Sequence, residues 1–190
     1  MPQFCTHHSS RSGPVEWVRR HSETIRQGGI VLDLACGRGR HTHFLLDQGF
    51  KVTAVDLDIS QLKVDRKTDN LRIVEHDLEG GAKWPFESKG FDGIVAINYL
   101  FRPLFPKIID ALAENGILIY QTFADGNEKL GKPRNQNYLL HENELLGAFG
   151  QRLTVIEFDQ GYIEQPSPAI VQRICCINNF GFGSLAAKKG

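Results

Sequence analysis

The chain has 190 residues, with 22 Lys plus Arg and 22 Asp plus Glu, so its formal net charge is zero. A protein that binds nucleic acid through the phosphate backbone, or a membrane through a polybasic anchor, normally carries a basic excess, so neither partner is expected. The length and a hydrophobic content of 41%, ordinary for globular proteins, predict a single domain over residues 1–190.

The cysteines and histidines argue against a stapled or metal-dependent fold. Four cysteines at irregular spacing fit neither a disulfide scaffold nor a zinc ribbon, and the seven histidines form no helical i, i+4 pair, so no metal site is expected. The first residues do not resemble a secretory signal and no apolar run approaches 18 residues, which predicts a cytoplasmic protein. Residues 1–14 are predicted to be an N-terminal arm and residues 178–190 a C-terminal tail.

The first half of the chain alternates predicted helices and strands. A helix is expected over Val15–Gln27, closed by two glycines. The nearly continuous apolar run Ile30–Ala35 predicts a strand buried on both faces of a parallel sheet. The alternation continues with a helix over His41–Gln48, a strand over Lys51–Asp56, a helix over Ser60–Lys67 and a strand over Leu71–Glu75.

The second half begins in the same way and then changes. A strand over Phe91–Ile97 is followed by a helix with Leu104, Ile108 and Leu112 at i, i+4 and i+8, then by a strand over Ile117–Phe123, a loop over Ala124–Asn137 and a short helix over Glu142–Phe149. Strands are then predicted over Leu153–Phe158 and Ala169–Ile177, and the loop Asp159–Pro168 between them is too short for a helix. These two strands must pair antiparallel, so an α/β fold is predicted, with a mostly parallel sheet and an antiparallel C-terminal hairpin.

Polar residues follow each predicted parallel strand, at the edge where open α/β sheets bind ligands. Gly37 and Gly39 let the backbone approach a ligand closely. A dinucleotide-binding fingerprint would have a third glycine where this chain has Thr42, and Asp33 inside the strand suits a cation better than a pyrophosphate. Asp56 ends the next strand, where a carboxylate can bind the two hydroxyls of a ribose. The pattern favours a cationic nucleoside ligand.

The run Asp33-Leu34-Ala35-Cys36-Gly37-Arg38-Gly39, together with Val55-Asp56, His76-Asp77-Leu78 and Phe91-Asp92-Gly93, resembles the class I S-adenosylmethionine-dependent methyltransferases over about residues 28–177. The resemblance implies a doubly wound, Rossmann-like sheet of seven strands in the order 3-2-1-4-5-7-6, with S-adenosylmethionine as cofactor and S-adenosylhomocysteine as product. It places Asp33 at the methionine amino group, Asp56 at the ribose, Asp77 and Leu78 at the adenine, and Asn98 beside the sulfonium. The cofactor-binding residues expected in full are Asp33, Ala35, Cys36, Gly37, Gly39, Arg40, Asp56, Leu57, Asp77, Leu78 and Asn98.

The substrate side is predicted from a narrower likeness, to small-molecule methyltransferases of the tellurite-resistance and thiopurine type. The segment Asn98-Tyr99-Leu100-Phe101 lacks the paired prolines of methylases that act on adenine or glutamine, so a small-molecule acceptor is expected. Our hypothesis is that Arg102, Lys132 and Arg134 orient an anionic substrate. Where a proton must leave, Tyr99, His41 or Glu128 is the candidate base, and Tyr99, Arg102 and Arg134 form the expected catalytic set.

Two alternatives stay open on the sequence. One is a nicotinamide-dependent reductase on a related fold, although Thr42 and the C-terminal hairpin speak against it. The other is a regulatory or partner subunit that binds the cofactor without turnover, because the cofactor motif indicates binding only. For the enzyme, the charges predict an acidic cofactor pocket entered through a basic mouth, bordered by Arg38, Arg40 and Arg102.

Overall fold

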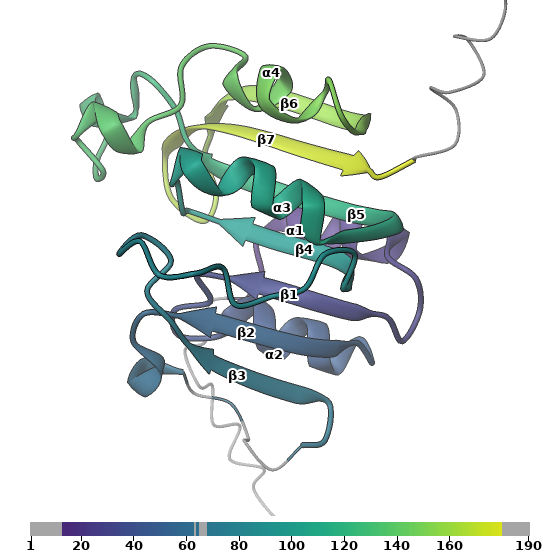
Figure 1. Cartoon of the computed structure of the whole chain (residues 1–190). Helices are drawn as coiled ribbons and strands as arrows, with labels where there is room; N and C mark the ends of the chain where they lie inside the picture. The colour runs from purple at the N-terminus through teal and green to yellow at the C-terminus, as the bar shows by residue number, and fades with distance from the viewer. Residues whose placement is uncertain (1–12, 63, 65–67, 180–190) are drawn as a thin grey trace, which may run out of the picture.

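The computed structural model describes residues 13–62, 64 and 68–179, and most of the predicted arm and tail lies outside these ranges. A seven-stranded sheet forms the centre of the described chain, in the order β3-β2-β1-β4-β5-β7-β6 (Figure 1). This confirms the predicted order. The strands are β1 (Ile30–Leu34), β2 (Lys51–Asp56), β3 (Leu71–Glu75), β4 (Phe91–Ile97), β5 (Leu112–Phe123), β6 (Thr154–Ile163) and β7 (Ala169–Ile177).

The first five strands run parallel, and β7 is antiparallel to both β5 and β6. The register places Asp33 opposite Val95, and Ile97 opposite Gln121. Because side chains alternate along a strand and paired residues point to the same side, all four of these side chains project from one face of the sheet. That face therefore presents Asp33 and Gln121 near its carboxyl-end edge, on either side of β4.

Helices cover both faces of the sheet (Figure 1). On the face of Asp33 lie α1 (Glu16–His21) and α2 (Arg40–Asp47), whose side chains Trp17, Val18 and Leu45 are buried against the strands. The opposite face is covered by α3 (Phe105–Ala111) and α4 (Glu144–Phe149), where the fully buried Tyr120 and Phe149 are the largest side chains of the core. Burial of one such large side chain contributes about 1.5–3 kcal/mol. None of the helices in the described ranges is long and apolar enough to span a membrane.

Two predicted helices are largely replaced by shorter turns. The helix expected over Val15–Gln27 ends at His21 and continues as the 3₁₀ turn Ser22–Thr24, where both hydroxyls of the turn donate to backbone carbonyls of the preceding turn and compete with the helix. The prediction of a helix over Ser60–Lys67 was wrong for its first residues, which belong to a 3₁₀ turn. The Asp58 side chain accepts the backbone N–H of Ser60 and caps a single 3₁₀ turn, while residues 63 and 65–67 lie outside the described ranges.

The boundary between α3 and β5 also differs from the prediction. Leu112 continues the apolar spacing of α3, yet it begins β5 and pairs with Phe91. The pairing then shifts register, and a Cβ on Gly116 would lie 2.9 Å from the carbonyl oxygens of both Ala113 and Phe91, so only glycine fits there. Near the C-terminus β6 extends to Ile163, which shortens the hairpin loop to residues 164–168, and α4 begins at Glu144 rather than at residue 142.

Candidate active site

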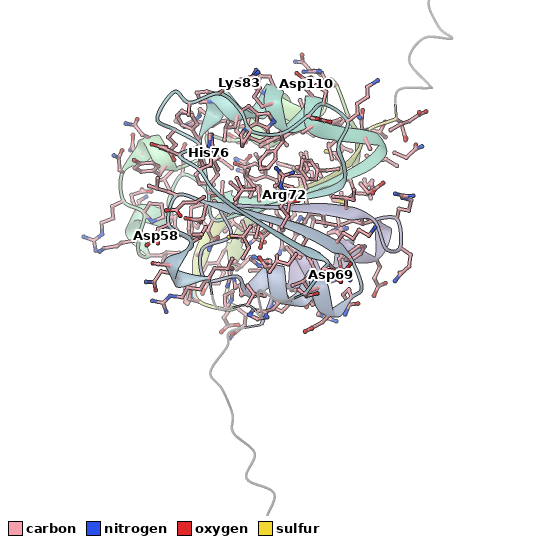
Figure 2. All side chains as sticks on the ribbon, turned by 60° about the horizontal axis from the view of Figure 1, so that its bottom comes forward. Asp58, Asp69, Arg72, His76, Lys83 and Asp110 are labelled. Atoms are coloured by element: carbon pink, nitrogen blue, oxygen red, sulfur yellow. The ribbon has the colours of Figure 1, made fainter. Side chains whose placement is uncertain are left out.

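A cavity of about 440 Å³ opens at the carboxyl ends of the parallel strands. Figure 2 shows Asp58 and His76, which follow β2 and β3, toward one edge of the molecule, while Asp69, which precedes β3, lies toward the other. The cavity brings together most of the residues predicted for the nucleoside half of the cofactor. Its lining consists of Ala35, Asp56, Leu57, His76, Asp77, Leu78, Glu79 and Tyr99.

Asp33 is the most deeply buried acid of the site. Its side chain is 2% exposed and accepts a 2.5 Å hydrogen bond from the Thr42 hydroxyl on α2. Burial raises the pKa of Asp33 to about 6, although the Thr42 hydrogen bond and the Arg40 guanidinium favour the charged form. A buried carboxylate with a single neutral hydrogen-bond partner suits a cationic ligand, because a positive charge would restore the ionised form.

The glycine turn and Asp56 form the next part of the site. Gly37 and Gly39 have positive φ angles of 53° and 80°, and a Cβ on Gly39 would collide with the Leu62 side chain. The backbone N–H of Gly37 donates to one carboxylate oxygen of Asp56 (2.8 Å), and that of Asp58 donates to the other (3.2 Å). Both oxygens are therefore fixed in position and retain lone pairs that can accept hydroxyl groups.

Asp77 and Tyr99 line the far side of the cavity. One oxygen of Asp77 accepts the backbone N–H groups of Glu79 and Gly80, each at 2.8 Å, which orients the carboxylate. The hydroxyl of Tyr99 is buried without a hydrogen-bond partner among the described residues. Burial raises the pKa of Tyr99 above its ordinary value, and the nearby Glu79 carboxylate adds to this. Tyr99 and Glu79 are thus two neighbouring polar side chains of the lining that a ligand in the cavity could contact.

Apolar and strained positions complete the cofactor side. Leu57 is 64% exposed beside the cavity and Leu78 is half-buried, so both can cover an aromatic base. Ala35 and Asn98 follow β1 and β4 with φ angles of 55° and 58°, a left-handed conformation that is unfavourable outside glycine and marks a functional turn. Cys36 is buried, and burial together with the Asp33 carboxylate raises the pKa of its thiol, so it is unreactive.

Comparisons with known proteins agree with this geometry. Residues 31–116 match the family described as methyltransferase domain. A curated relative, the Bacillus subtilis (strain 168) protein YqeM, which carries a provisional methyltransferase name, is 25% identical over 146 residues that cover 60% of this chain and 56% of that protein. The chain thus spans about half the length of this relative.

Solved structures share the fold along almost the whole chain. A Methanosarcina mazei S-adenosylmethionine-dependent methyltransferase is 14% identical with a TM-score of 0.66, covering 90% of this chain and 100% of that one. Haemophilus influenzae TehB is 18% identical (TM-score 0.66, 86% and 61% covered). Burkholderia thailandensis 1,6-didemethyltoxoflavin-N1-methyltransferase, solved with S-adenosylhomocysteine, is 20% identical (TM-score 0.61, 86% and 76% covered). Residues 31–116 thus form a methyltransferase domain, and the chain has the fold of the class I S-adenosylmethionine-dependent methyltransferases. This confirms the family resemblance.

Within the methyltransferase domain, Arg102 has a different environment from the one predicted. Its guanidinium makes four hydrogen bonds, two to the Glu144 carboxylate (2.5 and 2.9 Å) and two to the carbonyls of Asn137 and Leu139. Burial alone would raise the pKa of Glu144, but Arg102 holds it below its ordinary value. These contacts oppose the prediction that Arg102 orients a substrate, because the guanidinium already holds the segment after β5 against α4.

His41 and Glu128, two of the predicted bases, already accept hydrogen bonds from backbone N–H groups. His41 is buried, and its Nε2 accepts the backbone N–H of Val15 at 3.4 Å. Burial, together with the Arg40 charge, lowers the pKa of His41 to about 3. The Glu128 carboxylate accepts the backbone N–H of Gly126 within its own turn (2.8 Å). Neither group has the free, solvent-facing geometry expected of a general base.

The loop after β5 is fixed at its base. Asn127 is 1% exposed, and its carboxamide bonds to the Lys132 carbonyl and to the backbone N–H of Ile170. The Gln172 carboxamide joins the carbonyl of His141 to the N–H of Leu145. Lys132 and Arg134 are exposed, with no ion pair to any described residue, and neither lines the cavity at the carboxyl ends of the strands.

A hydrogen bond from the core supports the segment after β4. The hydroxyl of the buried Tyr120 donates to the carbonyl of Tyr99 at 2.7 Å. The Tyr120 ring packs edge-on against Phe105 and tilted against Phe149, so helices α3 and α4 fix its position. The backbone at Tyr99 is therefore positioned from the hydrophobic core.

A small recess of about 40 Å³ beside the cofactor cavity contains residues that the sequence did not single out. Gln121 and Ser167 line it together with Arg40 and Asn98. Gln121 is a polar residue near the end of a strand, but its place on the same face as Asp33 depends on the register of the sheet, which the sequence alone does not give. Ser167 gave no signal, because the fold of the hairpin loop decides where it lies.

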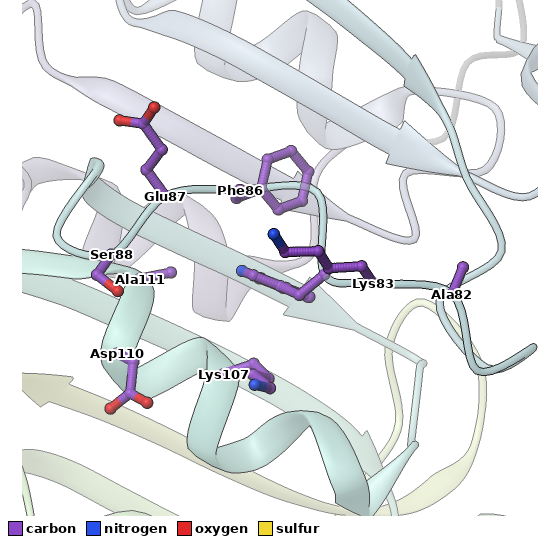
Figure 3. Close-up of a pocket in the computed structure, with 9 residues that line it drawn as sticks. Ala82, Lys83, Phe86, Glu87, Ser88, Lys107, Asp110 and Ala111 are labelled. Carbon is purple, nitrogen blue, oxygen red and sulfur yellow. The ribbon is translucent and has the colours of Figure 1, made fainter.

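A second cavity, of about 390 Å³, lies apart from these residues. Figure 3 shows it between the segment that carries Ala82, Lys83 and Phe86–Ser88 and the helix α3, with Lys107 and Asp110 on the helix side. Ser88 shortly precedes β4 and Asp110 shortly precedes β5, so this cavity reaches the amino ends of the strands. None of the predicted site residues lines it. Among the described residues, no cluster of three or more His, Cys, Asp or Glu side chains could hold a metal ion.

Proposed function

We propose that the protein catalyses methyl transfer from S-adenosylmethionine to a small, anionic acceptor molecule. The observation that carries the proposal is a pair of carboxylates, Asp56 and Asp77, that line one cavity and are oriented by backbone N–H groups. A third carboxylate, that of Asp33, is buried in β1 two residues before Ala35 of the cavity lining and accepts a hydrogen bond from the Thr42 hydroxyl. An ammonium group, a vicinal diol and an adenine amine are the groups that such carboxylates complement. The solved Burkholderia protein of similar fold, crystallised with bound 1,6-didemethyltoxoflavin, supports a small-molecule acceptor.

Each carboxylate has its own part in holding the cofactor. Asp33 would pair with the methionine ammonium, and the backbone at Ala35 and Gly37 would line the same end. Asp56 would accept the ribose hydroxyls, since two backbone N–H groups already fix its oxygens. Asp77 would accept the adenine amine between the side chains of Leu57 and Leu78. The remaining assignments, of Cys36, Gly39, Arg40 and Asn98 to the cofactor, rest on their positions in the turns after β1 and β4.

The bound cofactor supplies a methyl group that is already activated on a sulfonium. The acceptor forms a bond to the methyl carbon as the carbon–sulfur bond breaks, and the electron pair remains on sulfur. The chain must therefore position the acceptor and exclude water more than move protons. Two of the predicted bases are poorly suited to accept a proton, since His41 is held neutral and the pKa of Tyr99 is raised. An acceptor that arrives ionised fits this site.

The exposed charges agree with an anionic acceptor. Lys132 and Arg134 extend from the loop after β5 without ion pairs to described residues, and they can attract an anion toward the site. Tyr99 would close the acceptor side of the cofactor cavity. We assign Arg102 a positioning role, through Glu144, in place of the substrate contact predicted from the sequence.

Binding of S-adenosylhomocysteine to Asp56→Ala tests the cofactor assignment, with Asp69→Ala at the opposite end of the sheet as the matched control. Loss of charge-assisted hydrogen bonds to the ribose should weaken binding by about 1.5–3 kcal/mol, measured by calorimetry. The control should bind like the parent. If folded Asp56→Ala binds within about 1 kcal/mol of the parent, the assignment is wrong. Transfer of a labelled methyl group from S-adenosylmethionine to any small molecule would exclude a subunit that binds without turnover.

A further inference from the structure

The recess beside the cofactor cavity carries an inference about the acceptor. It lies at the carboxyl ends of β4 and β5, on the face of α1 and α2, and its floor is Gln121 and Phe123 of β5. Pro166 and Ser167, from the hairpin loop between β6 and β7, form its outer wall. None of these four residues belongs to the expected cofactor set. Arg40 and Asn98, which belong to that set, also line the recess, so it adjoins the cofactor site and extends beyond it.

Gln121 is the unusual residue of this recess. Its side chain is buried, with 3% of the residue exposed, yet its carboxamide makes no hydrogen bond to any residue in the described ranges. Only its backbone carbonyl is bonded across the strand end, to the N–H of Asn98. The Gln121 carboxamide is not among the fully buried side-chain atoms that lack a partner, so it retains some exposure in the recess that it lines. A ligand in the recess could therefore supply its hydrogen bonds.

Arg40 gives the recess its charge. The residue is half-buried at the start of α2, and the part of the chain that the structure describes offers it no ion pair within 4.0 Å. Burial lowers the pKa of its guanidinium, and the Asp33 carboxylate partly offsets this. The Asn98 carboxamide and the Ser167 hydroxyl also line the recess. A guanidinium, two carboxamides and a hydroxyl together provide the donors that a planar anion accepts.

The position of the recess favours the acceptor over the cofactor as the source of that anion. Asp33 on β1 and Gln121 on β5 lie on the same face, separated by β4. Two strand spacings correspond to roughly 10 Å, and Gln121 lies further toward the carboxyl end of the sheet. Asn98, expected beside the sulfonium, lies between them. A group in the recess would therefore sit beyond the methionine end of the cofactor, where the nucleophile must approach.

We propose that this recess binds the carboxylate of the methyl acceptor, and that Arg40, in place of the cofactor contact proposed above, determines with Gln121 and Ser167 the specificity for small carboxylic acids. The inference rests on the proposed methyltransferase function and names the class of its substrate. A volume of about 40 Å³ admits a group of only a few heavy atoms, since one water needs about 10–15 Å³ on this measure. An ionised carboxylate also needs no general base at the site.

The first experiment uses protein saturated with S-adenosylhomocysteine and measures binding of benzoate and of its neutral isostere benzamide. Benzoate should bind at least tenfold more tightly than benzamide. Gln121→Leu and Ser167→Ala should each reduce benzoate affinity severalfold, while Gln151→Leu, in an exposed turn, should not. Gln121→Leu removes an amide that has no hydrogen bond to a described residue and keeps most of the side-chain volume, so it should keep the parent's melting temperature. If Gln121→Leu does not fold, the benzoate affinity of Ser167→Ala tests the proposal in its place.

The second experiment distinguishes the acceptor's carboxylate from that of the cofactor. 5′-Methylthioadenosine shares the nucleoside of S-adenosylhomocysteine but lacks the amino-acid group. We expect benzoate to bind both complexes alike. If benzoate binds only beside methylthioadenosine, and Gln121→Leu weakens S-adenosylhomocysteine binding, the recess holds the cofactor carboxylate and the inference is overturned. Equal binding of benzoate and benzamide also overturns it. Failure of the parent to bind S-adenosylhomocysteine would instead contradict the proposed function.

Discussion

Replacing Asp33 with Asn should make the free protein more stable while it weakens cofactor binding. The pKa of this buried carboxyl is raised from 3.8 to about 6, so the folded protein binds its proton more tightly than the unfolded chain does. The stability that the protonated Asp33 carboxyl contributes is therefore fully present below pH 3.8 and is lost as the pH rises through 6. The loss in free energy of unfolding is about 0.5 kcal/mol at pH 4 and about 3 kcal/mol at pH 7.

The assay is urea unfolding of parent and Asp33→Asn, each without ligand, at pH 4 and pH 7. The asparagine oxygen can still accept the Thr42 hydroxyl, so the substitution removes the charge with little change in shape. We expect a gain for the variant of up to about 3 kcal/mol at pH 7 that nearly disappears at pH 4. Asp47→Asn, exposed at the end of α2, serves as the control and should change stability by less than about 0.5 kcal/mol at both values.

The ionisation of Asp33 should also make cofactor binding depend on pH. Because the ammonium of the cofactor needs the charged carboxylate, binding of S-adenosylhomocysteine should release a proton near pH 6 and weaken about tenfold for each pH unit below it. Calorimetry in buffers of different ionisation enthalpy measures this proton release. Asp33→Asn should bind weakly and independently of pH in this range. A variant that is no more stable than the parent at pH 7, or an advantage that persists at pH 4, would refute the reasoning.

Two further predictions follow from His41 and Arg102. His41 has a pKa of about 3 in the folded protein against 6.5 in the unfolded chain, so its neutral form contributes stability that is lost as the pH falls below 6.5. The difference in free energy of unfolding between the parent and His41→Gln should therefore fall by about 2 kcal/mol from pH 7.5 to pH 5. An unchanged difference would contradict burial of the neutral ring. Arg102→Met should destabilise the protein by about 1–3 kcal/mol, because Glu144 loses its bidentate partner. Arg102→Lys should restore little of this stability, since lysine cannot form the bidentate pair. A rise in KM at unchanged stability would instead support the predicted contact between Arg102 and the substrate.

The cofactor pocket was largely predictable because its residues occupy positions fixed by local sequence. Asp33 lies inside an apolar run, Gly37 follows it, and Asp56 ends the next run, so the alternation of strand and turn already places them at one edge. The structure brings Asp56 within hydrogen-bond distance of the Gly37 backbone, as that placement requires. Their roles toward the cofactor remain predictions.

The substrate side was less predictable because long-range contacts determine it. Arg102 reads as a free cation in the sequence, but its partner Glu144 comes from a helix 42 residues later. Gln121 reads as an ordinary strand residue, and only the pairing of β5 with β7 and the fold of the hairpin loop bury it. Leu112 gives a further example. Its spacing from Ile108 predicts a helical residue, but in the structure it begins β5 and pairs with Phe91.

The hydrogen bond from Tyr120 to the Tyr99 carbonyl connects the hydrophobic core to the acceptor side of the site. Its consequence concerns how this scaffold can diverge in function. A residue buried between α3 and α4 is normally under selection for packing alone, yet loss of this single hydroxyl would leave the aromatic packing in place and free the backbone at Tyr99. A substitution at this core position can therefore change the geometry of the segment after β4 without altering any residue that lines the cavity.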